Sequence, residues 1–263
     1  MTRRAPALIT LALLTLWFAV PLVPVFLWAF ADRWAFPAVL PQQWGLSGWL
    51  EAQKAGVPAA LGRSTLLGVG VSALAVTLGA AAARTLAWTS NRWDSALALT
   101  LLAPVALPPF ALAMGLDVLL LRLGVPPLLT LVTLLTVLAL PYTTYTLRAA
   151  YTGLDRGMEE QALLLGASPL VAFWRVTVPT LAPGLAAAAF LAFLIGWSDY
   201  VVTLVIGGGQ FTTLPLLIGS AASRTGNESA LAVMSLLSLG LPLLALLLAG
   251  TLRRTPTEAV NVG

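Results

Sequence analysis

Residues 64–83 read STLLGVGVSALAVTLGAAAA, a stretch of 20 positions without an Asp, Glu, Lys or Arg. A helix needs about 20 predominantly apolar residues to cross a bilayer, so this stretch predicts a transmembrane helix. Five more runs are long enough and equally free of charge: 5–31, 95–116, 123–147, 176–198 and 229–252. The fold class that we expect is therefore an all-α membrane protein with six transmembrane helices.

The composition agrees with this class. Of the 263 residues, 59% are hydrophobic and 9% are charged, whereas about a quarter of a soluble domain is charged. We expect one transmembrane domain over residues 1–263. Its predicted spans are about 8–30, 64–88, 96–120, 126–147, 184–206 and 230–251, with a polar connection at 148–183. A seventh charge-free stretch, 200–223, contains a Gly-Gly-Gly-Gln turn and Pro215; we interpret it as the end of span five followed by an outer or re-entrant segment.

Basic residues set the expected orientation. With six spans and the amino terminus inside, nine basic residues fall on the inner side and five on the outer side, as the positive-inside rule requires. The inner ones are Arg3, Arg4, Arg84, Arg92, Arg148, Arg156, Arg175, Arg253 and Arg254. We expect a multi-pass protein of a bacterial inner membrane with both termini in the cytoplasm. Topology explains the net charge of +4, so nucleic acid is not an expected partner.

The apolar run that follows Arg4 is much longer than the apolar core of a signal peptide, so we interpret it as an uncleaved first span.

The segments outside the spans are short, except for the outer segment 32–63 and the inner connection 148–183. The outer segment 32–63 contains three tryptophans among turn-forming residues, which favours a position along the lipid interface with a short helix near 47–55. Close helix contacts are expected where small residues recur, at Gly79 with Ala83 and at Ala188 with Ala192.

The inner connection carries charges that are costly to place in lipid, among them Asp155, Glu159 and Glu160. Residues 159–165 are good helix formers and Gly166 is a natural stop. Ser168 then suits a helix N-cap and Pro169 the first helical position. The pattern predicts two short helices joined by a tight turn.

The second of these helices should be short and end before Pro179. Leu170, Phe173, Trp174 and Thr177 recur at helical spacing, so they should form one apolar face that a partner's groove can bind. The alternatives are burial of Phe173 and Trp174 against the protein's own helix ends, and an ordinary solvated helix start for Glu159 and Glu160.

These residues also carry a family resemblance. Glu160, Gln161 and Ala162 are followed after three residues by Gly166, and after nine more by Val176, Thr177, Val178 and Pro179. This order resembles the Glu-Ala-Ala loop of ABC importer permeases, which runs Glu-Ala-Ala, three residues, Gly, nine residues, Ile, any residue, Leu, Pro. The departures are Gln161, Val176 and Val178, and all three preserve helix propensity or apolar character.

The resemblance covers about 61–252, including the proline-rich 103–109, Trp-Ser-Asp-Tyr at 197–200 and Leu-Pro-Leu at 214–216. It is similar to the branch of type I importers whose members carry polyamines, thiamine or ferric iron. It implies the type I permease fold with a cytoplasmic coupling helix, and these partners: ABC ATPase subunits, a second permease subunit that we expect to be a different chain, and an extracytoplasmic solute-binding protein. The chain itself would need no cofactor, because ATP and Mg²⁺ would be bound by the ATPase.

Two groups of site residues follow from the loop, the resemblance and the acids near the spans. The ATPase-coupling residues are expected to be Glu159, Glu160, Ala162, Gly166, Ala167, Ser168, Pro169, Leu170, Phe173, Trp174, Arg175 and Pro179. The translocation path is expected to include Asp199 and Tyr200, and Asp117 if it faces the bundle rather than the headgroups. An acid on the path would favour a cationic solute.

Other functions find less support. The chain has no His and no Cys, so an intramembrane enzyme or a metal site has few residues to build on. An ATP-independent secondary transporter or channel remains the alternative, although we find no internal repeat and no paired intramembrane charges of the kind typical of that class. A phosphate-binding loop is also missing from the sequence, so any ATP must bind to another chain.

Overall fold

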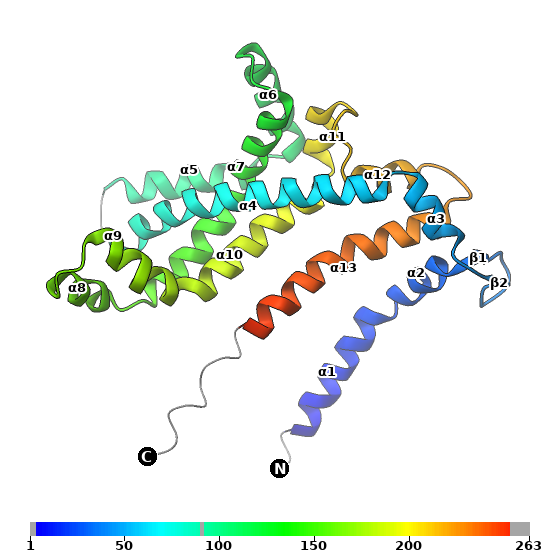
Figure 1. Cartoon of the computed structure of the whole chain (residues 1–263), viewed down its shortest axis with the longest axis horizontal. Coiled ribbons are helices and arrows are strands. Elements are labelled where there is room, and N and C mark those ends of the chain that lie inside the picture. The colour runs from blue at the N-terminus through cyan, green and yellow to red at the C-terminus, as the bar shows by residue number, and fades with distance from the viewer. Residues whose placement is uncertain (1–3, 90–91, 253–263) are drawn as a thin grey trace. The chain divides into compact units, whose positions relative to one another are not determined.

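The computed structural model describes residues 4–89 and 92–252 (Figure 1). These residues divide into two compact units. The first combines the chain up to Leu61 with Thr213–Leu243, and the second combines Gly62–Thr212 with the chain from Leu244 onward. The fold is dominated by helices, as predicted, and one two-stranded sheet is the exception.

In the first unit, α1 (Arg4–Ala19) and α2 (Leu22–Ala29) lead into strands β1 (Ala31–Arg33) and β2 (Gln43–Trp44). The helix α3 (Ser47–Lys54) follows, then the start of α4 (Val57–Trp88), and later α12 (Leu214–Ala222) and most of α13 (Glu228–Leu252). The Ser47 N–H donates to the Asp32 carboxylate at 2.9 Å, and the Ser229 hydroxyl donates to the Ala31 carbonyl at 2.5 Å. The short helix expected near 47–55 is confirmed, whereas the antiparallel hairpin before it was not predicted.

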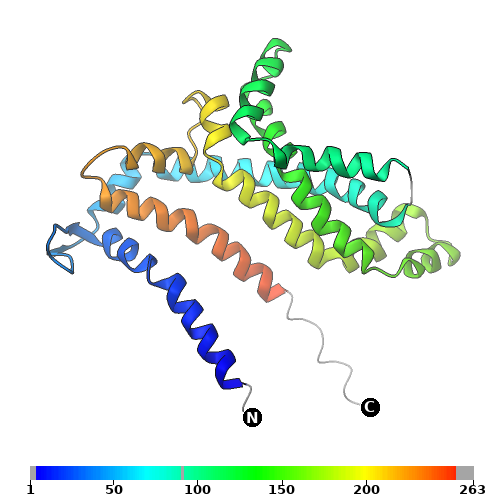
Figure 2. The same ribbon diagram turned by 180° about the vertical axis from the view of Figure 1, so that it is seen from behind.

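The second unit contains the rest of α4 and the helices that follow it (Figures 1 and 2). These are α5 (Asp94–Ala106), α6 (Pro109–Arg122), α7 (Pro127–Thr152), α8 (Arg156–Leu164), α9 (Pro169–Ala172), the π-helical turn η1 (Phe173–Thr177), α10 (Val178–Ser198) and α11 (Val201–Gly207). Helices α4, α7 and α10 form its core, where residues such as Val71, Leu134 and Ala192 are fully buried.

Small residues let these core helices approach closely, as the sequence predicted. Ala83, Ala188 and Ala192 are completely buried. A Cβ placed on Gly79 would lie 2.5 Å from the Thr143 hydroxyl oxygen of α7. A second close crossing, not predicted, lies between α4 and α10, where a Cβ on Gly196 would lie 2.9 Å from the α4 backbone.

Helix length and composition support four to six spans among the described residues. Four helices, Val57–Trp88, Pro127–Thr152, Pro169–Ser198 and Glu228–Leu247, are long and apolar enough to cross a membrane. Two bent pairs, one bent by 44° between α1 and α2 and one by 105° between α5 and α6, raise this to six if each is a single span. Pro21 precedes α2 and Pro108 precedes α6; proline cannot donate the helical hydrogen bond and clashes with the preceding turn, which explains both breaks.

Two predicted boundaries are wrong because the chain breaks elsewhere. The expected continuous helix at 96–120 is instead the bent pair α5 and α6, with Leu107 and Pro108 in extended conformations. The expected span 184–206 ends at Ser198, where Asp199 adopts an extended conformation and the chain starts the separate helix α11.

Candidate functional site

The connection between α7 and α10 has the local structure that its residues predict. The Asp155 carboxylate accepts the Gly157 N–H at 2.9 Å and so caps α8. Gly166 has φ +89°, a left-handed conformation that favours glycine. The Ser168 hydroxyl then accepts the Val171 N–H at 3.4 Å, and Pro169 opens α9. The stop, the cap and the proline position are all confirmed.

The predicted end of this second helix before Pro179 is wrong. Residues Pro169–Ser198 form one helical rod, in which the Val178 N–H bonds to the Phe173 carbonyl five residues earlier. A π-helical turn is wider than an α-helical one. We attribute the tolerance of Pro179 to this turn, because its ring would otherwise crowd the carbonyl of Arg175.

Four large apolar side chains on this connection face solvent. Their exposed fractions are 87% for Leu164, 89% for Leu165, 69% for Leu170 and 60% for Trp174. We call this set the leucine–tryptophan face. Leu164 and Leu165 were missed by sequence reasoning, although the run of three leucines directly before Gly166 contains a signal: consecutive helical residues cannot all face the protein interior.

Two of the predicted face residues point inward. Thr177 is completely buried and its hydroxyl donates to Glu159 at 2.9 Å. Phe173 is half-buried, with its ring 5.6 Å from the Trp174 ring. The expected single apolar face at 170, 173, 174 and 177 is therefore wrong, because the wider π turn and the polar partner of Thr177 rotate these positions apart.

Glu159 also points inward. Its carboxylate accepts a hydrogen bond from the Arg84 guanidinium at 2.6 Å, and the Glu159 side chain is 12% exposed. Arg84 in turn lies over the Trp88 ring at 4.8 Å and near the Phe173 ring at 5.8 Å. These residues form what we call the anchor cluster: Arg84, Trp88, Glu159, Phe173 and Thr177. It joins the C-terminal end of α4 to α8 and η1.

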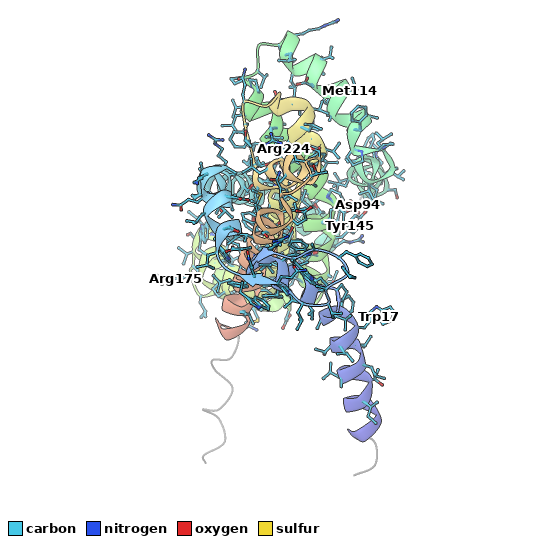
Figure 3. The ribbon with its side chains drawn as sticks, turned by 90° about the vertical axis from the view of Figure 1, so that its right-hand side faces the viewer. Trp17, Asp94, Met114, Tyr145, Arg175 and Arg224 are labelled. Atoms are coloured by element: carbon cyan, nitrogen blue, oxygen red, sulfur yellow. The ribbon has the colours of Figure 1, made fainter. Side chains whose placement is uncertain are left out.

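The remaining predicted coupling residues lie around these two sets. Glu160 and Pro179 are exposed, whereas Ala162 and Ala167 are half-buried. Arg175, labelled in Figure 3, is exposed too. The motif's own glutamate, Glu160, thus faces outward while its neighbour Glu159 is held inside. The arrangement suits a surface that binds another protein through apolar contacts and is fixed from behind by charge.

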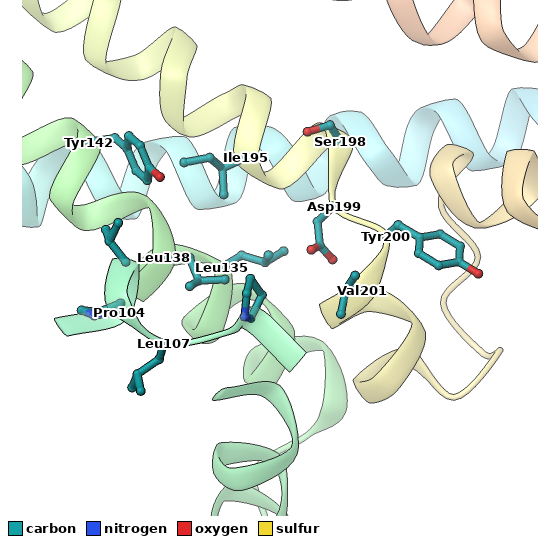
Figure 4. A pocket seen from close by; sticks show the side chains of 12 residues that line it. Pro104, Leu107, Leu135, Leu138, Tyr142, Ile195, Ser198, Asp199, Tyr200 and Val201 are labelled. Atoms are coloured by element: carbon teal, nitrogen blue, oxygen red, sulfur yellow. The ribbon is translucent and has the colours of Figure 1, made fainter. Parts of the chain in front are cut away.

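A second feature of this unit is a pocket of about 440 Å³ beside the break between α10 and α11. Its lining includes Tyr142, Ser198, Asp199 and Tyr200, together with prolines of the bend between α5 and α6 (Figure 4). The Asp199 carboxylate accepts the Thr203 N–H and hydroxyl at 2.7 and 2.9 Å. Asp117 lies on α6 and is not part of this lining. Of the three predicted path residues, Asp199 and Tyr200 therefore line the pocket and Asp117 does not.

Comparisons with known proteins address the family. The model of the "Binding-protein-dependent transport system inner membrane component" family matches residues 75–255. The molybdenum transport permease ModB of Mycobacterium bovis is 31% identical over 199 residues, 70% of this chain and 74% of ModB. The putrescine transport permease PotI of Escherichia coli K12 is 37% identical over 87 residues, 33% of this chain. That match spans only about a third (31%) of the length of PotI.

Solved structures agree on the fold. A bacterial ABC transporter involved in the import of the acidic polysaccharide alginate superimposes with a TM-score of 0.70, at 14% identity, over 96% of both chains. An amino acid ABC transporter superimposes with a TM-score of 0.58, at 15% identity, over 80% of this chain and 98% of its own.

Proposed function

Because the chain belongs to the family of binding-protein-dependent transport system inner membrane components, we propose that it is the permease subunit of an ABC importer, driven through the leucine–tryptophan face by a separate ATPase. Proteins of this family are transport components of the membrane rather than enzymes. The observation that carries the proposal is the exposure of Leu164, Leu165, Leu170 and Trp174 on a turn fixed from behind by the anchor cluster.

The physical basis of coupling is the burial of that face. Large apolar side chains on a short helix are the usual anchors of a helix that enters a partner's groove. ATP and Mg²⁺ would be bound by the ATPase, and closure of two ATPase subunits would displace this turn and the helical rod behind it. The other partners would be a second permease subunit, which we expect to be a different chain, and an extracytoplasmic solute-binding protein.

The solute is proposed from the pocket. Asp199 places a carboxylate at a pocket that Tyr142, Ser198 and Tyr200 also line, which favours a cationic solute such as a polyamine, thiamine or ferric iron over an oxyanion. In proteoliposomes with the whole transporter, Asp199→Asn should reduce uptake of labelled putrescine at least roughly tenfold, the equivalent of about 1.4 kcal/mol. Asp117→Asn, outside the pocket, is the matched control. Equal uptake by the two variants would remove Asp199 from the path.

The proposed orientation places both termini and the loop between α7 and α10 in the cytoplasm. The chain has no cysteine, so a cysteine introduced at Glu160 can be labelled without background. A membrane-impermeant maleimide should react with Glu160→Cys only in inside-out vesicles. Reaction in intact, right-side-out vesicles would place the loop outside and end the proposal.

The function is tested by ATP turnover. The purified chain should hydrolyse no ATP, whereas the chain reconstituted with its ATPase and binding protein should do so when solute is present. Trp174→Ala should abolish the stimulation that the permease gives to the ATPase. Phe173 is a less suitable site for this test because its ring belongs to the anchor cluster. Stimulation unchanged by Trp174→Ala and Leu170→Ala together would contradict coupling through this face.

A further inference from the structure

We propose that Arg84 is a positioning residue that ties α4 to the loop between α7 and α10, so that α4 and the leucine–tryptophan face move as one body during the ATPase cycle. This inference rests on the proposed function and extends it to a helix that the family motif does not include. Arg84 lies 75 positions before Glu159 in the sequence. A displacement of the loop can therefore reach the end of α4 only through noncovalent contacts.

The central contact is charged and shielded. The Arg84 guanidinium and the Glu159 carboxylate are 2.6 Å apart, and their side chains are 39% and 12% exposed. The second carboxylate oxygen of Glu159 accepts the hydroxyl of the buried Thr177 at 2.9 Å. One carboxylate thus joins α4, α8 and η1. Removal of the guanidinium would leave a mostly buried anion with one neutral donor, which is unfavourable.

Aromatic rings fix the direction of this contact. The Arg84 guanidinium lies 4.8 Å from the Trp88 ring, a favourable cation–π geometry. The Trp88 indole N–H donates to the Tyr151 carbonyl at 3.3 Å, and the Tyr151 ring meets the indole edge-on at 5.1 Å. The end of α7 therefore holds the same tryptophan that holds Arg84.

A second arginine closes the arrangement from the loop side. The Arg156 guanidinium lies 5.3 Å from the Trp88 ring and donates to the Trp88 carbonyl at 3.3 Å. Arg156 is the first residue of α8. The carbonyls at a helix C-terminus lack intrahelical partners, so a cation there is stabilised. Two arginines, one from each side, thus lock α8 against the last turn of α4.

This geometry has a mechanical consequence. The loop is already joined covalently to α7 and, through the continuous rod, to α10. The contacts of Arg84 add α4 to that body. Without them, α8 would be held against α4, within the described part of the chain, only by the contacts of Arg156 with Trp88, so the loop could shift relative to the end of α4 when the ATPase moves it.

The test measures the distance between α4 and α8 directly. The cysteine-free chain allows spin labels at Leu74→Cys on α4 and Met158→Cys on α8, which are 46% and 45% exposed. Leu74 lies about 15 Å along α4 from Arg84. In the whole transporter, the labelled pair should give one narrow distance distribution that is the same with and without ATP. Arg84→Gln should broaden it, and ATP should then shift it by about 2 Å or more.

Controls separate this role from general destabilisation. Arg148→Gln removes an arginine from the end of α7 that forms no ion pair within the described residues, and it should leave the distribution narrow. Arg84→Lys keeps the charge but loses the planar fork and its stacking, so it should give an intermediate width. If Arg84→Gln does not fold, Glu159→Gln removes the same charge pair while its amide oxygen can still accept the Thr177 hydroxyl.

Two results would overturn the inference. The first is a narrow distribution of label distances in Arg84→Gln, or in Glu159→Gln if Arg84→Gln does not fold. The second is a shift of the label distance with ATP when Arg84 and Glu159 are unchanged. The widths are also measured on the permease alone in nanodiscs, without ATPase. In nanodiscs, the label distances should be narrowly distributed with Arg84 present and broadly distributed in Arg84→Gln. If that is found but ATP turnover does not depend on Trp174, the proposed function fails while the tie between α4 and α8 stands.

Discussion

The leucine–tryptophan face makes a quantitative prediction for ATPase binding. Leu164 and Leu165 are 87% and 89% exposed, so they contribute almost nothing to the stability of the chain itself. Complete burial of one leucine side chain is worth about 1.5–3 kcal/mol relative to exposure. Replacement of both by serine should therefore weaken ATPase binding by about 3 kcal/mol, or roughly 100-fold in Kd, with allowance for incomplete burial at the interface rim.

The assay is the affinity of the permease in nanodiscs for its purified ATPase, measured by biolayer interferometry, together with the thermal unfolding of the permease. Leu40→Ser is the matched control, since Leu40 is also exposed, at 60%, but lies in the segment between β1 and β2. The double variant should lose affinity and keep its unfolding temperature. A change in Kd below about threefold, or a lowered unfolding temperature, would refute the assignment of these leucines to a docking surface.

Three further predictions concern other positions. Gly166→Ala should destabilise the turn by about 1–2 kcal/mol, because an alanine at φ +89° is strained. No atom lies within 4 Å of the added Cβ, so backbone strain is the whole cost, and amide hydrogen exchange in α8 should speed up accordingly. Gly196→Ala should lower the unfolding temperature by crowding the α4 backbone at 2.9 Å, at a cost of about 1–3 kcal/mol; Gly70→Ala, with open space around it, is the control. Hydrogen bonds from Ser47 hold the pKa of Asp32 below its usual range, so the stability they add is present above the unfolded pKa near 4 and is lost as pH falls through the lower folded value. The protection factor of the Ser47 amide, which is its exchange rate corrected for the intrinsic rate at each pH, should then fall in acid, and Asp32→Asn should abolish that dependence.

The features that sequence predicted well are those that a residue decides by its own chemistry. Gly166 adopts positive φ, Ser168 caps a helix and Pro169 occupies the first helical position, and each preference acts over two or three neighbouring residues. The apolar runs likewise predicted the approximate places of the four long apolar helices and of the two bent pairs. Such signals depend on no contact far away in the chain.

The features that failed depend on distant partners or on how a break is resolved. Glu159 and Glu160 are adjacent and identical in kind, and the distant partners Arg84 and Thr177 hold Glu159 inward. The span expected at 96–120 includes the prolines of 103–109, but its charge-free pattern does not predict the extended conformations of Leu107 and Pro108 or the 105° bend that results. Pro179 predicted a helix end because proline has no backbone N–H to donate. The helix nevertheless continues, because the wider π-helical turn before Pro179 accommodates the proline.

That continuity at Pro179 bears on how the two candidate sites communicate. The rod from Pro169 to Ser198 has 30 residues, about 45 Å at the α-helical rise. Leu170 of the leucine–tryptophan face lies at its start, and Asp199 of the pocket directly follows its end. A helix that ended before Pro179 would have placed a flexible joint between them. Because the helix continues, a tilt imposed on the face must displace the pocket lining, and no separate relay of side chains is needed along the way.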